Sequence, residues 1–242
     1  MWTWRSTKIG IVFLGSIGLN SLIFAQDSRR DTSLIIASAD YLDLMGKEAV
    51  LYTGAEYISP RQQIEGTPFF GQESRFKGDV MLAGTWFFSL PIHYDLVNDK
   101  LLIWSFDQSQ LLVMNSEKID RFRLDNEEFV RGGVFVKAKE NQRSEFYQFI
   151  HEGKIVVLAQ KKKVIVQKSA ADKSFAYYKQ FNRFFIVLDE DWIEVNGKKS
   201  LLTIFSNQKE KIKSFIKNEK LNYNKSPELF LQRAVAYYES IR

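Results

Sequence analysis

Residues 120–125, DRFRLD, show the alternation that decides the fold of this chain. Phe122 and Leu124 lie on one side of an extended backbone, and Arg121, Arg123 and Asp125 lie on the other, because successive side chains of a strand project to opposite faces. This two-residue period predicts a β-strand with one face in a core and one face in water.

Similar short runs of β-branched and aromatic residues extend from Glu48 to Val195, beginning with AVLYTG and separated by turn signals. No helical periodicity interrupts them, which favours an antiparallel arrangement over a parallel sheet. Gly132 and Gly133 lie within one run, and glycines inside a strand pattern predict a bulge or a sharp bend. We therefore expect a mainly β fold of the α+β kind, an antiparallel meander that forms a curved sheet or partial barrel.

Turn signals place the ends of the predicted strands. Asn98 and Asp99 lie between two apolar runs, and both residue types tolerate the left-handed backbone that a two-residue hairpin requires. Glu152 and Gly153 form a similar signal next to His151. Further turns are predicted at residues 161–163, in QKKKV, and at residues 189–191, in VLDEDWI.

His93 and Asp95 are the residues most open to a catalytic interpretation. They are two positions apart and therefore share a strand face, which places an imidazole near a carboxylate as in half of a catalytic triad. Catalysis also requires a nucleophile, and the chain has no nucleophile elbow or other recognisable serine context. We therefore interpret both as strand residues beside a hairpin, with Asp95 supporting the turn.

No motif marks a metal or cofactor site. The chain has two histidines and no cysteine, and DED at residues 189–191 lacks the alternating carboxylates and glycine of a calcium loop. We predict no catalytic, metal-ligating or cofactor-binding residue, and no cofactor. Trp86 and Trp104 could stack on sugars, although such residues more often pack in a core. With His93 and Asp95 they are the candidates for a polar or aromatic binding site.

The N-terminal residues have the features of a secretory signal peptide. Arg5 and Lys8 precede an apolar run from Ile9 to Phe24, and cleavage after Ala25 fits the preference for a small residue. An uncleaved anchor is the alternative, but the run is short and contains glycine, serine and asparagine. We expect an exported protein, periplasmic or secreted, without a stable transmembrane span after cleavage.

Four segments follow from these signals. The signal peptide occupies residues 1–25, a lead-in residues 26–47, the antiparallel β domain residues 48–196 and a helical segment residues 197–242. The net charge of +5 includes the two cations of the signal, so the exported chain carries +3. Lysines cluster near the C-terminus, but Glu210 and Glu219 interrupt them. We expect a solvated amphipathic face there and no binding to nucleic acid.

The C-terminal segment changes from a two-residue to a helical period. We expect two to three helices that pack on the open side or edge of the sheet, which protects it from edge-to-edge association. The residues that predict them are Leu201, Leu202 and Phe205 in the first helix, Asn207 and Glu210 in a capping box of the second, and Ser226 and Pro227 at the start of the third.

The order of signal peptide, β-rich middle and C-terminal helices resembles that of exported proteins from Gram-negative bacteria to which no activity is attached. Two segments carry the resemblance: residues 84–104, GTWFFSLPIHYDLVNDKLLIW, and residues 198–241, which begin KKSLLTIF. The resemblance implies a location and an order of elements, and it implies no chemistry.

The sequence predicts an exported, non-catalytic envelope protein that binds an apolar or glycan ligand or a partner protein, with lipid, glycan and envelope proteins as the expected partners. The alternative is a hydrolase that acts on envelope or extracellular polymer through carboxylates that no motif marks. Paired catalytic carboxylates are recognised by their separation, which a sequence does not supply. An acid pair in a cleft would favour the enzyme.

Overall fold

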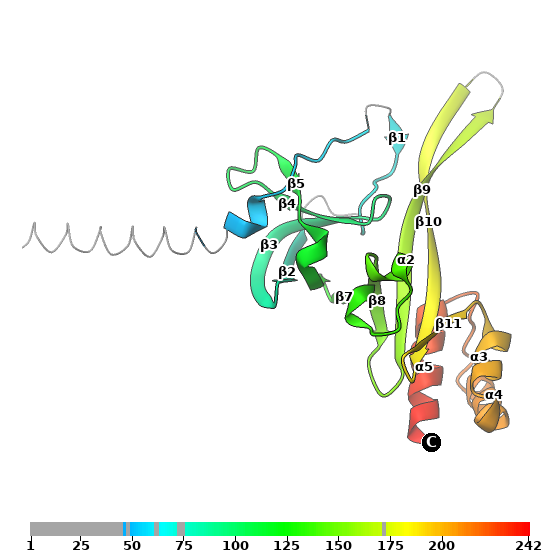
Figure 1. Ribbon diagram of the computed structural model, residues 1–242. Coiled ribbons are helices and arrows are strands. Elements are labelled where there is room, and N and C mark those ends of the chain that lie inside the picture. Colours follow the sequence, from blue (N-terminus) through cyan, green and yellow to red (C-terminus); the bar gives the residue numbers. More distant parts are fainter. Residues whose placement is uncertain (1–45, 47–48, 61–62, 72–75, 171–172) are drawn as a thin grey trace, which may run out of the picture. The chain divides into compact units, whose positions relative to one another are not determined.

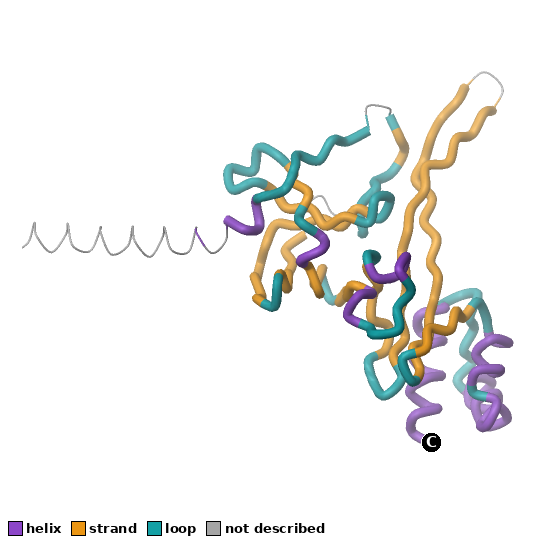
Figure 2. Tube along the Cα trace, viewed as in Figure 1, coloured by secondary structure: helices purple, strands orange, loops and turns teal. Residues whose placement is uncertain are grey.

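The computed structural model of the chain describes residues 46, 49–60, 63–71, 76–170 and 173–242 (Figures 1 and 2). The predicted signal peptide and nearly all of the predicted lead-in lie outside the described residues. The chain divides into two compact units, Met1–Val50 and Leu51–Arg242, and all strands belong to the second. None of the helices in the described ranges is both long and apolar enough to cross a membrane.

The described residues form a mainly β fold with eleven strands in one largely antiparallel sheet that is not closed, as the sequence predicts. Strands β2 to β5 form one meander, β6 returns beside β2, and β6 to β11 form a second meander. Only β1 is parallel to its neighbour, β10. The strands are β1 Ile64–Glu65, β2 Phe76–Leu82, β3 Thr85–Asp95, β4 Lys100–Trp104, β5 Leu111–Val113, β6 Ile119–Leu124, β7 Glu127–Arg131, β8 Phe146–His151, β9 Val156–Ala170, β10 Lys173–Leu188 and β11 Asp191–Val195.

The alternation in β6 sets the buried face of the sheet. Phe122 and Leu124 are fully buried, whereas Arg123 between them is exposed, which confirms the predicted register. Phe122 stacks on Phe129 of β7 with ring centroids 4.7 Å apart, and Tyr94 of β3 packs edge-on against both rings. Burial of these aromatic rings provides the apolar area that stabilises this half of the sheet.

Three C-terminal helices pack on the other half of the sheet. They are α3 Lys198–Ile204, α4 Lys209–Asn218 and α5 Pro227–Ser240, and a short helix, α2 Glu140–Arg143, lies between β7 and β8. Contacts join α5 to β8 and β9 (Figure 1). The buried face of the helices includes the predicted Leu201, Leu202 and Phe205. The helical stripes therefore cover one face of the sheet, as expected.

The predicted helix starts are half correct. Pro227 occupies the first turn of α5 after Ser226, as predicted. The predicted cap Asn207 is wrong, because Ser206–Gln208 form a 3-10 turn and α4 begins after Gln208. The amide of Asn207 instead donates to the hydroxyl of Tyr238 at 3.2 Å, so tertiary packing uses the group that the local pattern assigned to a cap.

The turns show similar corrections. The β3–β4 connection is Leu96–Asp99 rather than two residues, although Asp99 does have the expected positive φ of 56°. The β10–β11 turn is Asp189–Glu190 with φ angles of 49° and 69°. The predicted turn at residues 161–163 is wrong, because β9 runs through it without interruption. Each of these three lysines has a partner on its own side of the strand. The partners stabilise a strand where the run of three cations predicts a turn.

Two predicted strand runs end differently. AVLYTG contains a 3-10 helix, Ala49–Tyr52, because Leu51 is buried in the aromatic core. The run that contains Gly132 leaves the sheet after Arg131 and bends there, as the glycine pair predicts. A Cβ atom at Gly132 would overlap the carbonyl oxygen of Gln142, so only glycine fits this bend.

Candidate functional site

The structure brings together two of the four predicted site residues, His93 and Trp104. His93 is 2% exposed, and the indole Nε1 of Trp104 donates to its Nε2 at 3.1 Å. The ring of Phe69 lies 4.9 Å from the imidazole, measured between centroids. Trp86 lies elsewhere on β3, where it stacks with Phe88 and carries the guanidinium of Arg123 over its ring at 4.7 Å.

Asp95 is fully buried and its oxygens are occupied by donors. Oδ1 accepts hydrogen bonds from the backbone N–H of Val97 at 2.8 Å and of Asn98 at 3.2 Å. Oδ2 accepts from the hydroxyl of Tyr57 at 3.0 Å and the side-chain amide of Asn98 at 2.7 Å. Asp95 therefore closes the β3–β4 turn and ties it to the segment before β1. This is the turn-supporting role inferred from the sequence.

A second acidic group, which is half-buried, centres on Asp99 and Glu145. Tyr94 donates to Asp99 Oδ1 at 2.5 Å and the backbone N–H of Phe146 donates to Oδ2 at 3.3 Å. Burial raises the pKa of Asp99 to about 6 despite these hydrogen bonds, and the charge of Glu145 contributes to the increase. Burial and Asp99 together raise the pKa of Tyr94.

Glu145 is held in the same way by three side chains. The hydroxyl of Tyr147 donates to it at 3.0 Å, and Gln160 and Lys162 donate to its two oxygens. Sequence reasoning missed this group because no motif marks it. Its carboxylates brace β8 and β9 through protein donors, so we do not assign it to a reaction.

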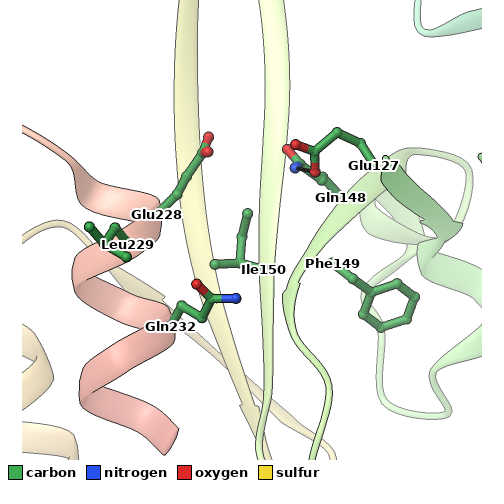
Figure 3. A pocket seen from close by; sticks show the side chains of 7 residues that line it. All are labelled: Glu127, Gln148, Phe149, Ile150, Glu228, Leu229 and Gln232. Atoms are coloured by element: carbon green, nitrogen blue, oxygen red, sulfur yellow. Dashed lines mark hydrogen bonds between the residues drawn. The ribbon is translucent and has the colours of Figure 1, made fainter. Parts of the chain in front are cut away.

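A pocket of about 240 Å³ opens beside α5 (Figure 3). Figure 3 shows the side chains of Glu228 and Gln232 on α5 facing Gln148 and Glu127 on the strands, with Ile150 between them. The pocket is lined by Glu127, Gln148, Phe149, Ile150, Glu228, Leu229 and Gln232. We call it the α5 pocket.

The strand wall of the α5 pocket carries a buried acceptor without a hydrogen-bond partner. Gln148 is 2% exposed, and its Nε2 donates to Glu127. Its Oε1 is buried and accepts no hydrogen bond from any described residue. A buried polar atom without a hydrogen-bond partner lowers stability by about 1–3 kcal/mol. A hydrogen-bond donor placed next to this oxygen would therefore be favourable.

The helix wall is held by an ion pair. Lys161 is 9% exposed, and its Nζ lies 2.7 Å from Glu228 Oε1 and 5.7 Å from the ring centroid of Phe70. Among the described residues, no cation lies within 4.0 Å of Glu127. The two carboxylates are thus matched by one lysine, and the pocket favours positive charge.

The α5 pocket is lined mainly by hydrogen-bond acceptors, and the amide of Gln232 can both donate and accept. No group of three or more histidine or carboxylate side chains able to hold a metal occurs in the described part of the chain. Sequence reasoning missed the pocket, because β7, β8 and α5 supply its residues from distant positions. The register that sets Phe129 opposite Gln148 and the packing of α5 bring them together.

A scan of protein-family models and searches of curated proteins and of solved structures found nothing that matches this chain.

Proposed function

We propose that this protein is an exported, non-catalytic binding protein whose α5 pocket takes a small ligand that carries N–H donors, such as a primary amine or an amino sugar. The observation that carries the proposal is the buried Oε1 of Gln148, which lacks a hydrogen-bond donor at the pocket wall. A ligand ammonium or amide group supplies that donor. Its binding then relieves the cost of the unsatisfied acceptor.

The negative charge of the α5 pocket determines which ligands with N–H donors it favours. Glu127 sits beside Gln148 and has no cationic partner among the described residues, while Glu228 already has Lys161. An ammonium group placed between Gln148 and Glu127 gains a charge-assisted hydrogen bond, which is stronger than a neutral one. A carboxylate or phosphate ligand would meet acceptors and like charge. Among the ligands expected from the sequence, an amine-bearing glycan unit fits better than a purely apolar molecule.

The size of the α5 pocket limits the enclosed part of the ligand. A volume of about 240 Å³ is that of about eight water molecules in the liquid. Ile150 supplies an apolar surface for a short carbon body between the two polar walls. Well-formed ligand sites combine such apolar surface with a few placed polar groups.

The alternative of a hydrolase would use Glu127 and Glu228 as its carboxylate pair. Glycoside hydrolysis needs one acid to protonate the leaving group and a second carboxylate to attack or to activate water. Here Gln148 donates to one of these acids and Lys161 is bonded to the other. These contacts favour binding over turnover.

Isothermal titration calorimetry tests the proposal. The probes are ethylammonium and glucosamine, with acetate and ethanol as controls for charge and size. We expect saturable binding of the two amines, and binding about tenfold weaker or more in Glu127→Gln, because a hydrogen bond to a charged group contributes about 1.5–3 kcal/mol. Glu140→Gln, at an exposed position of α2, is the matched control and should bind as the parent does.

Equal affinity of the parent and Glu127→Gln for both amines would refute the assignment of the α5 pocket. Cleavage of an amino-sugar oligomer by the parent, lost in Glu127→Gln, would replace binding by the hydrolase alternative.

A further inference from the structure

The hairpin formed by β9 and β10 extends beyond β8 and β11, and in its outer part β10 pairs with the two-residue strand β1. Its strands have 15 and 16 residues. β8 pairs with β9 only as far as Ala159, and β11 pairs with β10 only as far as Phe184. The outer part of the hairpin is therefore a ribbon (Figure 1), which we call the arm, residues 162–170 and 173–181.

One face of the arm combines exposed aromatic rings with lysines. Directly paired residues share a face, and the pairs Lys168 with Phe175, and Val164 with Lys179, place cations next to apolar groups. Phe175 and Phe181 are 43% and 40% exposed. We call the outer part of this face the arm face, and it consists of Val164, Val166, Lys168, Phe175, Tyr177, Lys179 and Phe181. Lys162, which pairs with Phe181, lies on the same side at the base of the arm.

The lysines of the arm face lack acidic partners. Lys161 and Lys162, at the base of the hairpin, are paired with Glu228 and Glu145. Among the described residues, no carboxylate lies within 4.0 Å of Lys168 or Lys179, and the Nζ of Lys168 lies 5.9 Å from the ring centroid of Tyr177. The arm is a cationic, aromatic surface.

The opposite face of the arm lies in part against β1 and the residue that follows it. Ala176 is 2% exposed and pairs with Ile64 of β1. Tyr178, on the same side as Ala176, lies near Gly66, which follows β1. Packing within the chain covers Ala176 on that face, where Ile165 is still 41% exposed. The arm face differs in combining its exposed rings with lysines.

We propose that the arm face docks on the surface of an anionic lipid bilayer. Aromatic side chains favour the headgroup region, where their rings are partly buried and their polar atoms stay wet. Lysines extend their ammonium groups to lipid phosphates while their stems cover apolar surface, and each lysine near an anionic membrane adds to the attraction.

The charge and the residue types of the arm face favour an anionic membrane over a second copy of the chain or a nucleic acid. Two copies of the arm face brought together would oppose lysine to lysine, which disfavours self-association. The face contains no arginine and hence none of the bidentate donors typical of nucleic-acid recognition. Docking of the arm is independent of the α5 pocket and goes beyond the function proposed for it.

Vesicle co-sedimentation tests the arm. The protein is purified from the periplasm of a bacterial expression host, and its N-terminus is read by mass spectrometry so that all variants are compared at the same processing. It is mixed with vesicles of phosphatidylcholine alone or with 30% phosphatidylglycerol, in low and high salt. We expect binding to the anionic vesicles that weakens with salt, as interactions of exposed charges do.

Two double variants and their controls locate the binding surface. Phe175→Ser/Phe181→Ser and Lys168→Gln/Lys179→Gln should each weaken binding to anionic vesicles about tenfold or more, through lost apolar burial and lost charge respectively. The matched controls are Phe106→Ser, at an aromatic ring that is 61% exposed, and Lys211→Gln/Lys217→Gln on α4. Both controls should bind as the parent does, with circular dichroism unchanged in all variants.

Three outcomes would overturn the proposal: no binding of the parent to anionic vesicles, unchanged binding by both arm variants, or binding lost only in the α4 control. If the arm variants instead abolish a dimer seen by light scattering and leave vesicle binding unchanged, the arm face is a contact between copies of the chain. None of these results depends on the α5 pocket.

Discussion

Replacement of Asp99 by asparagine should remove most of a pH dependence that this half-buried carboxyl imposes on stability. Asp99 accepts hydrogen bonds from Tyr94 and Phe146, and burial raises its pKa from 3.8 to about 6, with Glu145 raising it further and Lys162 lowering it. Asparagine keeps the shape of the side chain and tolerates the positive φ of 56° at this position. Its Nδ2 cannot accept a hydrogen bond, so the substitution also removes the bond from Tyr94 or from Phe146. That loss is the same at every pH, and the change of the stability difference with pH therefore reports the charge alone.

The sign follows from the direction of the pKa change. A carboxyl whose folded pKa lies above its unfolded pKa binds its proton more tightly in the folded protein, so it stabilises most below pH 3.8 and this contribution is lost as pH rises through about 6. At about 1.4 kcal/mol per pKa unit, the loss amounts to about 3 kcal/mol. The unfolding free energy of the parent minus that of Asp99→Asn should fall by most of this amount, about 2.4 kcal/mol, between pH 4 and pH 8.

Urea unfolding followed by circular dichroism at intervals of half a pH unit measures this difference. Asp125→Asn is the control, because Asp125 has the same φ of 56° in the β6–β7 turn but is exposed. Its difference curve should stay flat. Parallel stability curves for the parent and Asp99→Asn across pH 4–8 would show that the carboxyl is not buried as described.

Three further substitutions test other parts of the structure. Gly132→Ala should destabilise the protein by about 3 kcal/mol in urea unfolding, because the added Cβ meets the carbonyl oxygen of Gln142, and a loss below about 1 kcal/mol would contradict the bend. Asp95→Ala should lower the free energy of unfolding by about 3 kcal/mol, because it leaves buried donors without an acceptor. Calorimetric binding of ethylammonium should stay unchanged. Loss of binding with an intact fold would place Asp95 in the site. Gln148→Met should abolish amine binding and change stability by less than about 1 kcal/mol, since it removes the unsatisfied acceptor together with one hydrogen bond, and retained binding would refute its role.

The elements that the sequence predicts well are those whose periodicity one buried face determines. Phe122 and Leu124 alternate with charged residues because β6 packs one face against the aromatic core, and α3 carries its apolar stripe because it packs on the sheet. In such segments the local sequence pattern and the tertiary environment favour the same conformation, so the pattern alone is enough to predict the element.

The misread segments are those in which tertiary partners decide the conformation. Three consecutive lysines in β9 indicate a turn, yet Lys161 meets Glu228 on one face and Lys162 meets Glu145 on the other. The α5 pocket could not be predicted from the sequence for a related reason. Gln148 belongs to an ordinary strand in sequence, and only its burial beside Glu127 leaves its oxygen without a donor.

The most direct test of the proposed function observes the side-chain amide of Gln148 by NMR during titration of isotopically labelled protein with ethylammonium. The account predicts that this resonance shifts saturably with ethylammonium and does not shift with acetate, and that Glu127→Gln weakens the response. A Gln148 resonance that stays unmoved, or that follows both ions alike without saturation, would contradict an amine site in the α5 pocket.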